Sequence, residues 1–127
     1  MPEPDQMVAV RERMQQERTV WMATTRPDGR PHVAPIWFVW HVDRAYIMTG
    51  GVKLANVRHN GLAALNTEDG DNVVIVEGTA RIIPADDPLF QAVAQRFMEI
   101  YDWDISTSVG EQQLIEIAPV KTLAWKA

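Results

Sequence analysis

Apolar runs separated by short turn segments divide most of the chain into strands. These runs are rich in valine, isoleucine, threonine and aromatic residues, which favour extended structure. The segments between them carry Pro-Asp-Gly and Asp-Gly steps, which are typical of tight turns. The pattern predicts a mainly β fold with six to seven antiparallel strands, at residues 19–25, 31–42, 43–49, 62–67, 73–83, 113–119 and 120–127.

Three other segments have helical patterning. Residues 86–101 are the clearest, because Pro88 suits a first turn and apolar side chains share one face: Leu89, Phe90, Val93, Ala94, Phe97, Met98 and Tyr101. Residues 4–17 predict a short, mostly solvated N-terminal helix, and residues 52–60 a third. Closing the strands into a barrel would remove exposed sheet edges. We therefore expect one domain over residues 1–127, a barrel with flanking helices.

The run at residues 31–42, PHVAPIWFVWHV, is apolar on both faces of the expected strand. One face then covers the core, while the other meets a partner subunit or a flat ligand. Pro35 has no N–H to donate, so it marks an edge strand or a bulge. Gly78, inside the run at 73–83, indicates a bulge or a close approach of two backbones.

Composition narrows the class of protein. The formal net charge is −5, which argues against a general nucleic-acid-binding protein. The chain has no cysteine, its N-terminus is polar and acidic, and no run of eighteen apolar residues occurs. These features predict a cytoplasmic protein with no signal peptide and no membrane span. Five tryptophans in 127 residues suit interfaces and ligand pockets as well as a core.

The sequence lacks the usual catalytic constellations. The histidines show no metal-ligand spacing, and GxSxG, Walker and GxGxxG motifs are absent. Carboxylate pairs in and after the 86–101 segment suit helix caps and solvated loops better than acid–base chemistry. We expect no metal site, leave the catalytic residue unassigned and expect a bound cofactor to carry the chemistry.

The segment from Thr49 to Asn60 is the candidate anion site. Gly50 and Gly51 allow a close backbone approach, and a helix beginning near residue 52 would direct its positive end toward the same place. Lys53 adds a charge and Thr49 a hydroxyl donor. A solvated Gly-Gly turn explains the same residues equally well on their own.

Three stretches of the sequence together resemble a known family: TVWMATTRPDGRPHVAPIWFVW, AYIMTGGVKLANVRHNGLAALN and VVIVEGTARI, followed by a helix and PVKTLAWK. They resemble the pyridoxamine 5′-phosphate oxidase-like proteins, and within them the branch that uses the deazaflavin coenzyme F420. The resemblance runs from about Thr19 to Trp125. It implies an FMN-binding type of split β-barrel and a homodimer with cofactor sites at the subunit interface.

The resemblance also implies roles for individual residues. Beside the cofactor ring it places Val33, Ala34, Pro35, Ile36 and Trp37. At the phosphate end it places Thr49, Gly50, Gly51, Lys53 and Asn56, with Arg58 near the polyglutamate tail and Asn72 and Val73 reaching over from the partner chain. Tyr101 and Trp103 would line a substrate pocket. The family often has serine or a basic residue where Gly51 and Val52 stand.

The implied activity is hydride transfer from F420 to an electron-poor small molecule. Two alternatives stay open: an FMN-dependent oxidase or reductase of the pyridoxamine phosphate oxidase type, and a non-catalytic module that binds a flavin or a tetrapyrrole. The low number of arginine and lysine residues near the site favours F420 over FMN, whose terminal phosphate is a dianion. Fold and cofactor do not fix the substrate.

Overall fold

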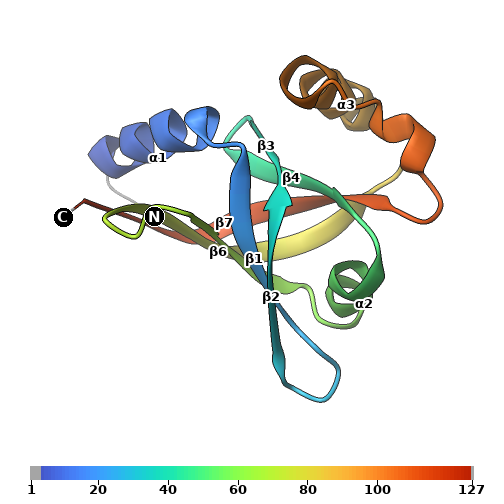
Figure 1. The fold of residues 1–127 in the computed structure, drawn as a ribbon, viewed down its shortest axis with the longest axis horizontal. Coiled ribbons are helices and arrows are strands. Elements are labelled where there is room, and N and C mark those ends of the chain that lie inside the picture. The colour runs from blue at the N-terminus through green and yellow to red at the C-terminus, as the bar shows by residue number, and fades with distance from the viewer. Residues whose placement is uncertain (1–3, 127) are drawn as a thin grey trace.

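The computed structural model describes the backbone of residues 4–126 and the side chains of residues 7–126. Seven strands, three α-helices and one short 3-10 helix follow one another along this part of the chain (Figure 1). In chain order they are α1 (Pro4–Gln16), β1 (Thr19–Thr25), β2 (Pro31–Trp37), β3 (Val39–His41), β4 (Arg44–Thr49), α2 (Gly51–His59), β5 (Leu62–Thr67), β6 (Asn72–Ile83), α3 (Pro88–Tyr101), η1 (Ile105–Ser108) and β7 (Gln113–Lys126).

The strands form one antiparallel sheet in the order β2-β1-β5-β6-β7-β4-β3. The sheet curls into a half-barrel whose two ends, β2 and β3, are not hydrogen-bonded to each other (Figure 1). The predicted class, a mainly β split barrel with flanking helices, is confirmed. The curl gives the sheet an inner and an outer face, and the helices cover only parts of each.

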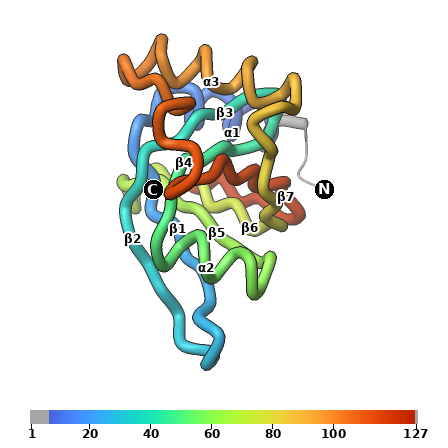
Figure 2. The backbone as a smooth tube through the Cα atoms, turned by 90° about the vertical axis from the view of Figure 1, so that its right-hand side faces the viewer, coloured from blue at the N-terminus to red at the C-terminus, as the bar shows by residue number. Residues whose placement is uncertain are grey.

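Two apolar clusters hold the helices against the sheet. On the inner face, Val10 and Met14 of α1 and Leu54 and Val57 of α2 pack with buried strand residues such as Leu65. On the other face, α3 packs against β4 and the start of β7 through its own buried side chains, Phe90, Val93, Phe97 and Tyr101. Figure 2 shows α3 along the top of the molecule and α2 in its lower half. Met98, expected on the packed face of α3, is instead exposed.

The single strand expected at residues 31–42 is wrong, because it divides at Phe38. β2 pairs with β1, whereas β3 pairs with β4 at the opposite end of the sheet. The N–H of Phe38 donates to the hydroxyl of Tyr101, 3.1 Å away, and its carbonyl oxygen lies 2.5 Å from the same hydroxyl. A side chain thus satisfies the backbone groups that would otherwise extend the ladder. Pro35 lies in an edge strand, as expected.

The two strands expected at residues 113–127 are also wrong, since β7 is continuous from Gln113 to Lys126. Its pairing with β6 shifts register between Glu77 and Gly78, which confirms the predicted bulge. A Cβ atom at Gly78 would collide with the carbonyl oxygen of Ala118. The bulge bends the long β6–β7 ribbon near Pro119 without interrupting it.

Candidate functional site

The N-terminus of α2 is short of hydrogen-bond partners. The helix begins at Gly51 with Gly50 as its N-cap, no side chain caps it, and its first turn contains no acidic residue. The first amides of a helix have no partner within the helix, and they carry partial positive charge. Lys53 lies beside them, partly exposed, and forms no salt bridge within the described part of the chain. This end of α2 therefore carries positive charge from Lys53 and from amides without partners in the helix.

The two glycines before α2 have local structural reasons. A Cβ atom at Gly50 would collide with the carbonyl oxygen of Glu111, so the chain passes tightly under the segment that leads into β7. Gly51 has a φ of 59°, in the left-handed region that favours glycine. Thr49 is buried at the end of β4, where its hydroxyl has only a long contact of 3.4 Å to the Gly50 carbonyl. Part of this segment is thus an ordinary tight turn.

Two other residues of this segment differ in their surroundings: Asn56 has a structural role, and Arg58 faces solvent. Asn56 is buried, and its amide donates to the hydroxyl of Thr24 on β1 over 3.0 Å. This bond ties α2 to the sheet, so Asn56 positions the helix. Arg58 is exposed near the C-terminal end of α2.

The five expected ring-binding residues alternate along β2. Val33, Pro35 and Trp37 face solvent, with 57% of Val33 and 46% of Trp37 exposed, whereas Ala34 and Ile36 face inward. No single surface presents all five side chains. A flat ring would contact either the three outward side chains or the free edge of β2, which pairs only with β1 among the described strands.

Trp37, Tyr101 and Trp103 come together, as the substrate-pocket hypothesis requires. Trp37 stacks on Tyr101 with ring centroids 4.7 Å apart, and Trp103 lies edge-on to Trp37 at 6.3 Å. Burial raises the pKa of Tyr101, and its hydroxyl also lies 2.6 Å from the carbonyl oxygen of Arg18. Tyr101 is therefore a fixed support, and the exposed aromatic surface belongs to Trp37.

Asn72 and Val73 do not join the α2 end of the site within one chain. Val73 pairs with Trp125 of β7, next to the end of β5 that lies opposite Val20. Asn56 instead contacts β1 at Thr24, four positions further along that strand. The site residues of one chain thus fall into two groups on different parts of the sheet.

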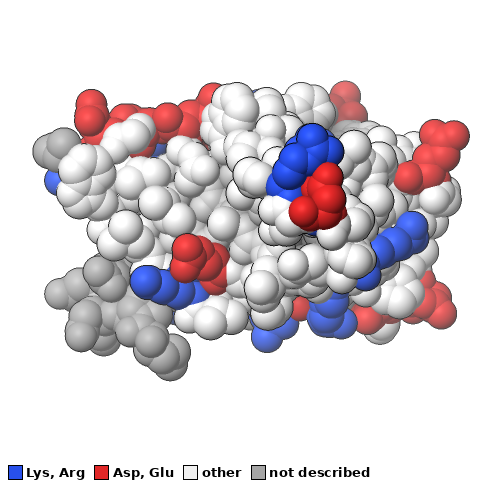
Figure 3. All heavy atoms as spheres, turned by 90° about the horizontal axis from the view of Figure 1, so that it is seen from below, with Lys and Arg blue, Asp and Glu red and all other residues white. Residues whose placement is uncertain are grey.

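An apolar outer face extends over β1, β5, β6 and β7. Cross-strand pairing aligns one row of outward residues over the sheet: Pro35, Trp21, Asn66, Ile75 and Leu123. Beside it lie the exposed Leu62 and Trp125 and a groove of about 550 Å³ whose lining includes Ala23, Ala64 and Val120. Figure 3 shows a mainly neutral face with scattered charges. The missed signal is apolar character at consecutive positions, and so on both faces of the strand, in residues 73–76 and 123–125.

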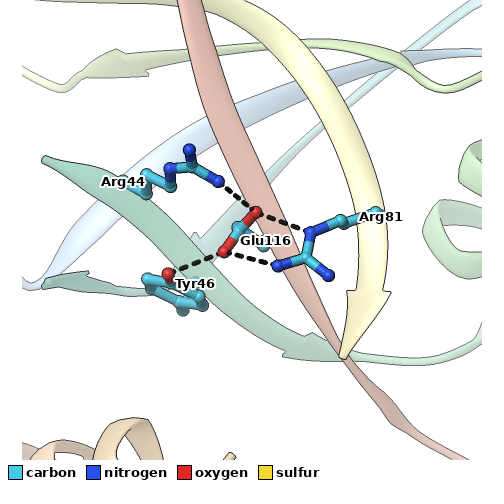
Figure 4. Close-up of polar contacts among 4 residues, drawn as sticks. All are labelled: Arg44, Tyr46, Arg81 and Glu116. Atoms are coloured by element: carbon cyan, nitrogen blue, oxygen red, sulfur yellow. Dashed lines mark hydrogen bonds and ion pairs between the residues drawn. The ribbon is translucent and has the colours of Figure 1, made fainter. Parts of the chain in front are cut away.

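A polar cluster that the sequence analysis did not predict surrounds Glu116 on β7 (Figure 4). Its carboxylate is buried and accepts hydrogen bonds from Arg44 at 2.8 Å, Arg81 at 2.9 Å and the hydroxyl of Tyr46 at 2.8 Å. Burial alone would raise the pKa of Glu116, but these donors outweigh it and hold the pKa below its usual range. Burial first, and then the hydrogen bond to Glu116, raise the pKa of Tyr46. Because its members satisfy one another, we interpret the cluster as structural.

Among the side chains of residues 7–126, no group of three or more histidine, cysteine or carboxylate residues could hold a metal ion. None of the described helices has the length and apolar character needed to cross a membrane.

The curled seven-stranded antiparallel sheet, open between β2 and β3 and flanked by helices, defines a split barrel of the FMN-binding type. The family model of pyridoxamine 5′-phosphate oxidase matches residues 7–126, so the chain belongs to that family. No curated protein matches it.

Solved structures show the same fold. One described as an F420 reductase is 21% identical, with a TM-score of 0.69, covering 97% of this chain and 98% of its own. A FAD-binding protein from Mesorhizobium loti is 17% identical, with a TM-score of 0.73, over 91% and 89%. The heme storage protein HutZ from Vibrio cholerae is 17% identical, with a TM-score of 0.80, over 98% and 95%. At these identities the likeness extends to the fold alone.

Proposed function

We propose that this protein is an oxidoreductase that binds the deazaflavin coenzyme F420 and uses it to reduce an electron-poor small molecule. The observation that carries the proposal is the N-terminus of α2, which has no capping side chain and no acidic residue but has Lys53 in its first turn. Such an end is a ready anion site, and a phosphate fits it. The F420 reductase among the similar structures supports the choice of cofactor.

The protein's own contribution is to bind and orient. Lys53 and the first amides of α2 hold the phosphate, and the outward side of β2, with Val33 and Trp37, lies beside the ring. When bound, the coenzyme would supply the hydride. Trp37, held in place by its stacking on Tyr101, and Trp103 line the substrate side. Tyr101 is not the proton donor in this proposal, because its hydroxyl bonds to backbone groups.

A second copy of the chain completes the site in this proposal. The apolar outer face, with Trp21, Leu62, Leu123 and Trp125 exposed, is larger than a monomer needs. Asn72 and Val73 lie beside this face, away from Lys53, so they reach a cofactor only from a partner chain. We therefore propose a homodimer with two interface sites.

Titration of the purified protein with F420 and, separately, with FMN tests the proposal. We expect F420 to bind with micromolar or tighter affinity and FMN to bind more weakly, since one lysine is a poor clamp for a dianion. A yellow preparation with an FMN spectrum and no response to F420 would assign the protein to the FMN-dependent class.

Turnover separates an enzyme from a binding module. Protein loaded with reduced F420 should reduce at least one member of a panel of enones and quinones. Ligand binding with no turnover over that panel, or tight binding of a tetrapyrrole in place of F420, would overturn the enzymatic assignment. Sedimentation at micromolar concentration checks the dimer, and a monomer that still binds the coenzyme would contradict the interface site.

A further inference from the structure

A second groove lies between the β1–β2 turn and α2. Its volume is about 400 Å³, and its lining consists of Arg26, Pro27, Asp28, Arg30, Val52, Ala55 and Asn56. The hairpin runs past α2 on the side of the molecule seen in Figure 2. The groove thus begins at the first turn of α2, where the phosphate is proposed to bind, and places two arginines from a turn against the helix.

The lining residues of α2 show which side of the helix faces this groove. Successive residues are about 100° apart around a helix, so Val52, Ala55 and Asn56 form one side. Lys53 lies about 100° from Val52 in one direction, and Arg58 about 120° in the other. Neither side chain lines the groove. A ligand that continues from the first turn of α2 along this side meets Arg26 rather than Arg58.

The side chain of Arg26 bonds only to a neutral carbonyl oxygen, whereas the charge of Arg30 is already paired with a carboxylate. The guanidinium of Arg26 donates to the carbonyl oxygen of Pro31 over 2.8 Å, and its backbone N–H bonds to the carbonyl oxygen of Arg30 at 2.8 Å. Arg30 pairs with Asp28 at 2.8 Å, so these two charges compensate each other. The backbone N–H and side chain of Arg30 keep the pKa of Asp28 low. The groove therefore carries one net positive charge, at Arg26.

We propose that this groove is a second anion subsite, in which Arg26 binds a carboxylate of the flexible, anionic tail of the cofactor. The inference rests on the proposed function, because it takes the phosphate at the first turn of α2 as the starting point of the tail. A ring-and-phosphate ligand without a tail would occupy only the Lys53 end. The β1–β2 turn thus selects for the length and charge of the tail.

The test compares F420 carrying its glutamate tail with the same coenzyme lacking the glutamates. In the wild-type protein the glutamylated form should bind more tightly. Arg26→Gln should weaken binding of the glutamylated form by about fivefold to tenfold and change the tail-less form by less than about twofold. Asp28→Asn removes the only carboxylate from the groove lining, so it should tighten the glutamylated form by about twofold.

Three further variants make the result decisive. Arg26→Lys keeps the charge and should restore part of the preference, which a merely structural role in the turn would not predict. Arg58→Gln tests the other side of α2, and a selective loss of the glutamylated form there would overturn the inference. Arg11→Gln, on α1, removes a cation remote from α2 and should change neither form.

The outcomes also separate this inference from the proposed function. If wild-type protein binds both forms and Arg26→Gln weakens both equally or neither, the coenzyme assignment stands and the subsite is wrong. If wild-type protein binds neither form, the proposed function fails and the subsite fails with it.

Discussion

The helices α2 and α3 begin in opposite ways. At the start of α3, the carboxylate of Asp87 accepts the N–H of Leu89 over 2.9 Å, and Pro88 occupies the first turn, where an N–H would have no partner. At the start of α2, Gly50 supplies no side chain, and the first turn carries a lysine instead of an acid. A cation there opposes the helix dipole, whereas the acid at α3 complements it.

The difference separates folding from function. The N-terminus of α3 and the carboxylate of Glu116 both find their hydrogen-bond partners within the chain, so both contribute to stability. The α2 terminus leaves donors and a charge without protein partners in the described residues, so these exposed groups are open to water or to an anion. Removing a side chain whose partners lie within the chain should therefore lower the free energy of unfolding. Removing Lys53 at the start of α2 should instead weaken ligand binding.

Gly50→Ala should cause the largest loss in the free energy of unfolding. It is the exception among changes at α2, because it distorts the start of the helix itself. The new Cβ atom collides with the backbone carbonyl of Glu111, which has no flexible end to move away. We expect a loss of about 3 kcal/mol in the free energy of unfolding, measured by urea denaturation. Gly51→Ala is the matched control, because it meets no atoms and suffers only its φ of 59°. It should cost about 1 kcal/mol. Equal losses in the two variants would contradict the close approach.

Lys53→Ala should act on binding alone. The loss of one charged phosphate contact should weaken F420 binding by about 2 kcal/mol, or roughly thirtyfold, in a fluorescence titration. The free energy of unfolding without ligand should stay the same or rise by about 0.3 kcal/mol, because a cation leaves the helix N-terminus. A stability loss that matches the binding loss would mean that Lys53 supports the fold. Arg11→Ala, an exposed cation on α1, is the control.

Glu116→Gln should show the reverse, a loss of stability with little change in binding. At neutral pH the variant should lose about 2 kcal/mol, since Arg44 and Arg81 keep partial hydration while Tyr46 loses a charged acceptor. The pKa of Glu116 is lowered in the folded state, so its stabilisation is complete above the ordinary glutamate value of 4.5 and disappears as pH falls through the folded pKa. Urea denaturation at pH 7 and below pH 4.5 checks this, and a difference that grows in acid would refute it.

Much of the fold could be predicted because local patterns agree with the tertiary structure. The strand at 19–25, the bulge at Gly78 and the proline at the start of α3 all follow from residue type and spacing. The break at Phe38 could not be predicted, since it depends on the hydroxyl of Tyr101, 63 residues away. The continuity of β7 through Pro119 likewise depends on pairing with β6.

The candidate site could be predicted only as a segment. Residue types marked Thr49–Arg58 correctly as a polar turn before a helix, yet they gave no direction for each side chain. The bond from Asn56 to Thr24 and the placement of Arg26 in the groove beside α2 both depend on how the hairpin lies against the helix. The same limit hid Glu116, whose partners come from two other strands, β4 and β6.

Asp87→Ala should lower stability by about 1 kcal/mol, because the N–H of Leu89 loses its acceptor and the dipole of α3 loses a compensating charge. F420 affinity should not change, since α3 and α2 lie apart and pack in separate apolar clusters (Figure 2). Urea denaturation and coenzyme titration on the same preparation measure both quantities. Asp86→Ala, in the same loop but outside the cap, is the matched control and should lose less. A fall in affinity would show that the two helix ends are coupled.

The smallest effect expected is that of inorganic phosphate on the protein without cofactor. An anion that binds only the folded protein stabilises it by RT ln(1 + [L]/Kd), about 0.4 kcal/mol when the phosphate concentration equals its Kd. Thermal unfolding should therefore shift upward by about 2 °C at that concentration, relative to chloride at equal ionic strength. Lys53→Ala should reduce the shift, whereas Asp87→Ala should keep it, because the α3 cap already has its acceptor within the chain. An equal shift in wild-type protein and Lys53→Ala would place the anion elsewhere and remove the distinction between the two helix ends.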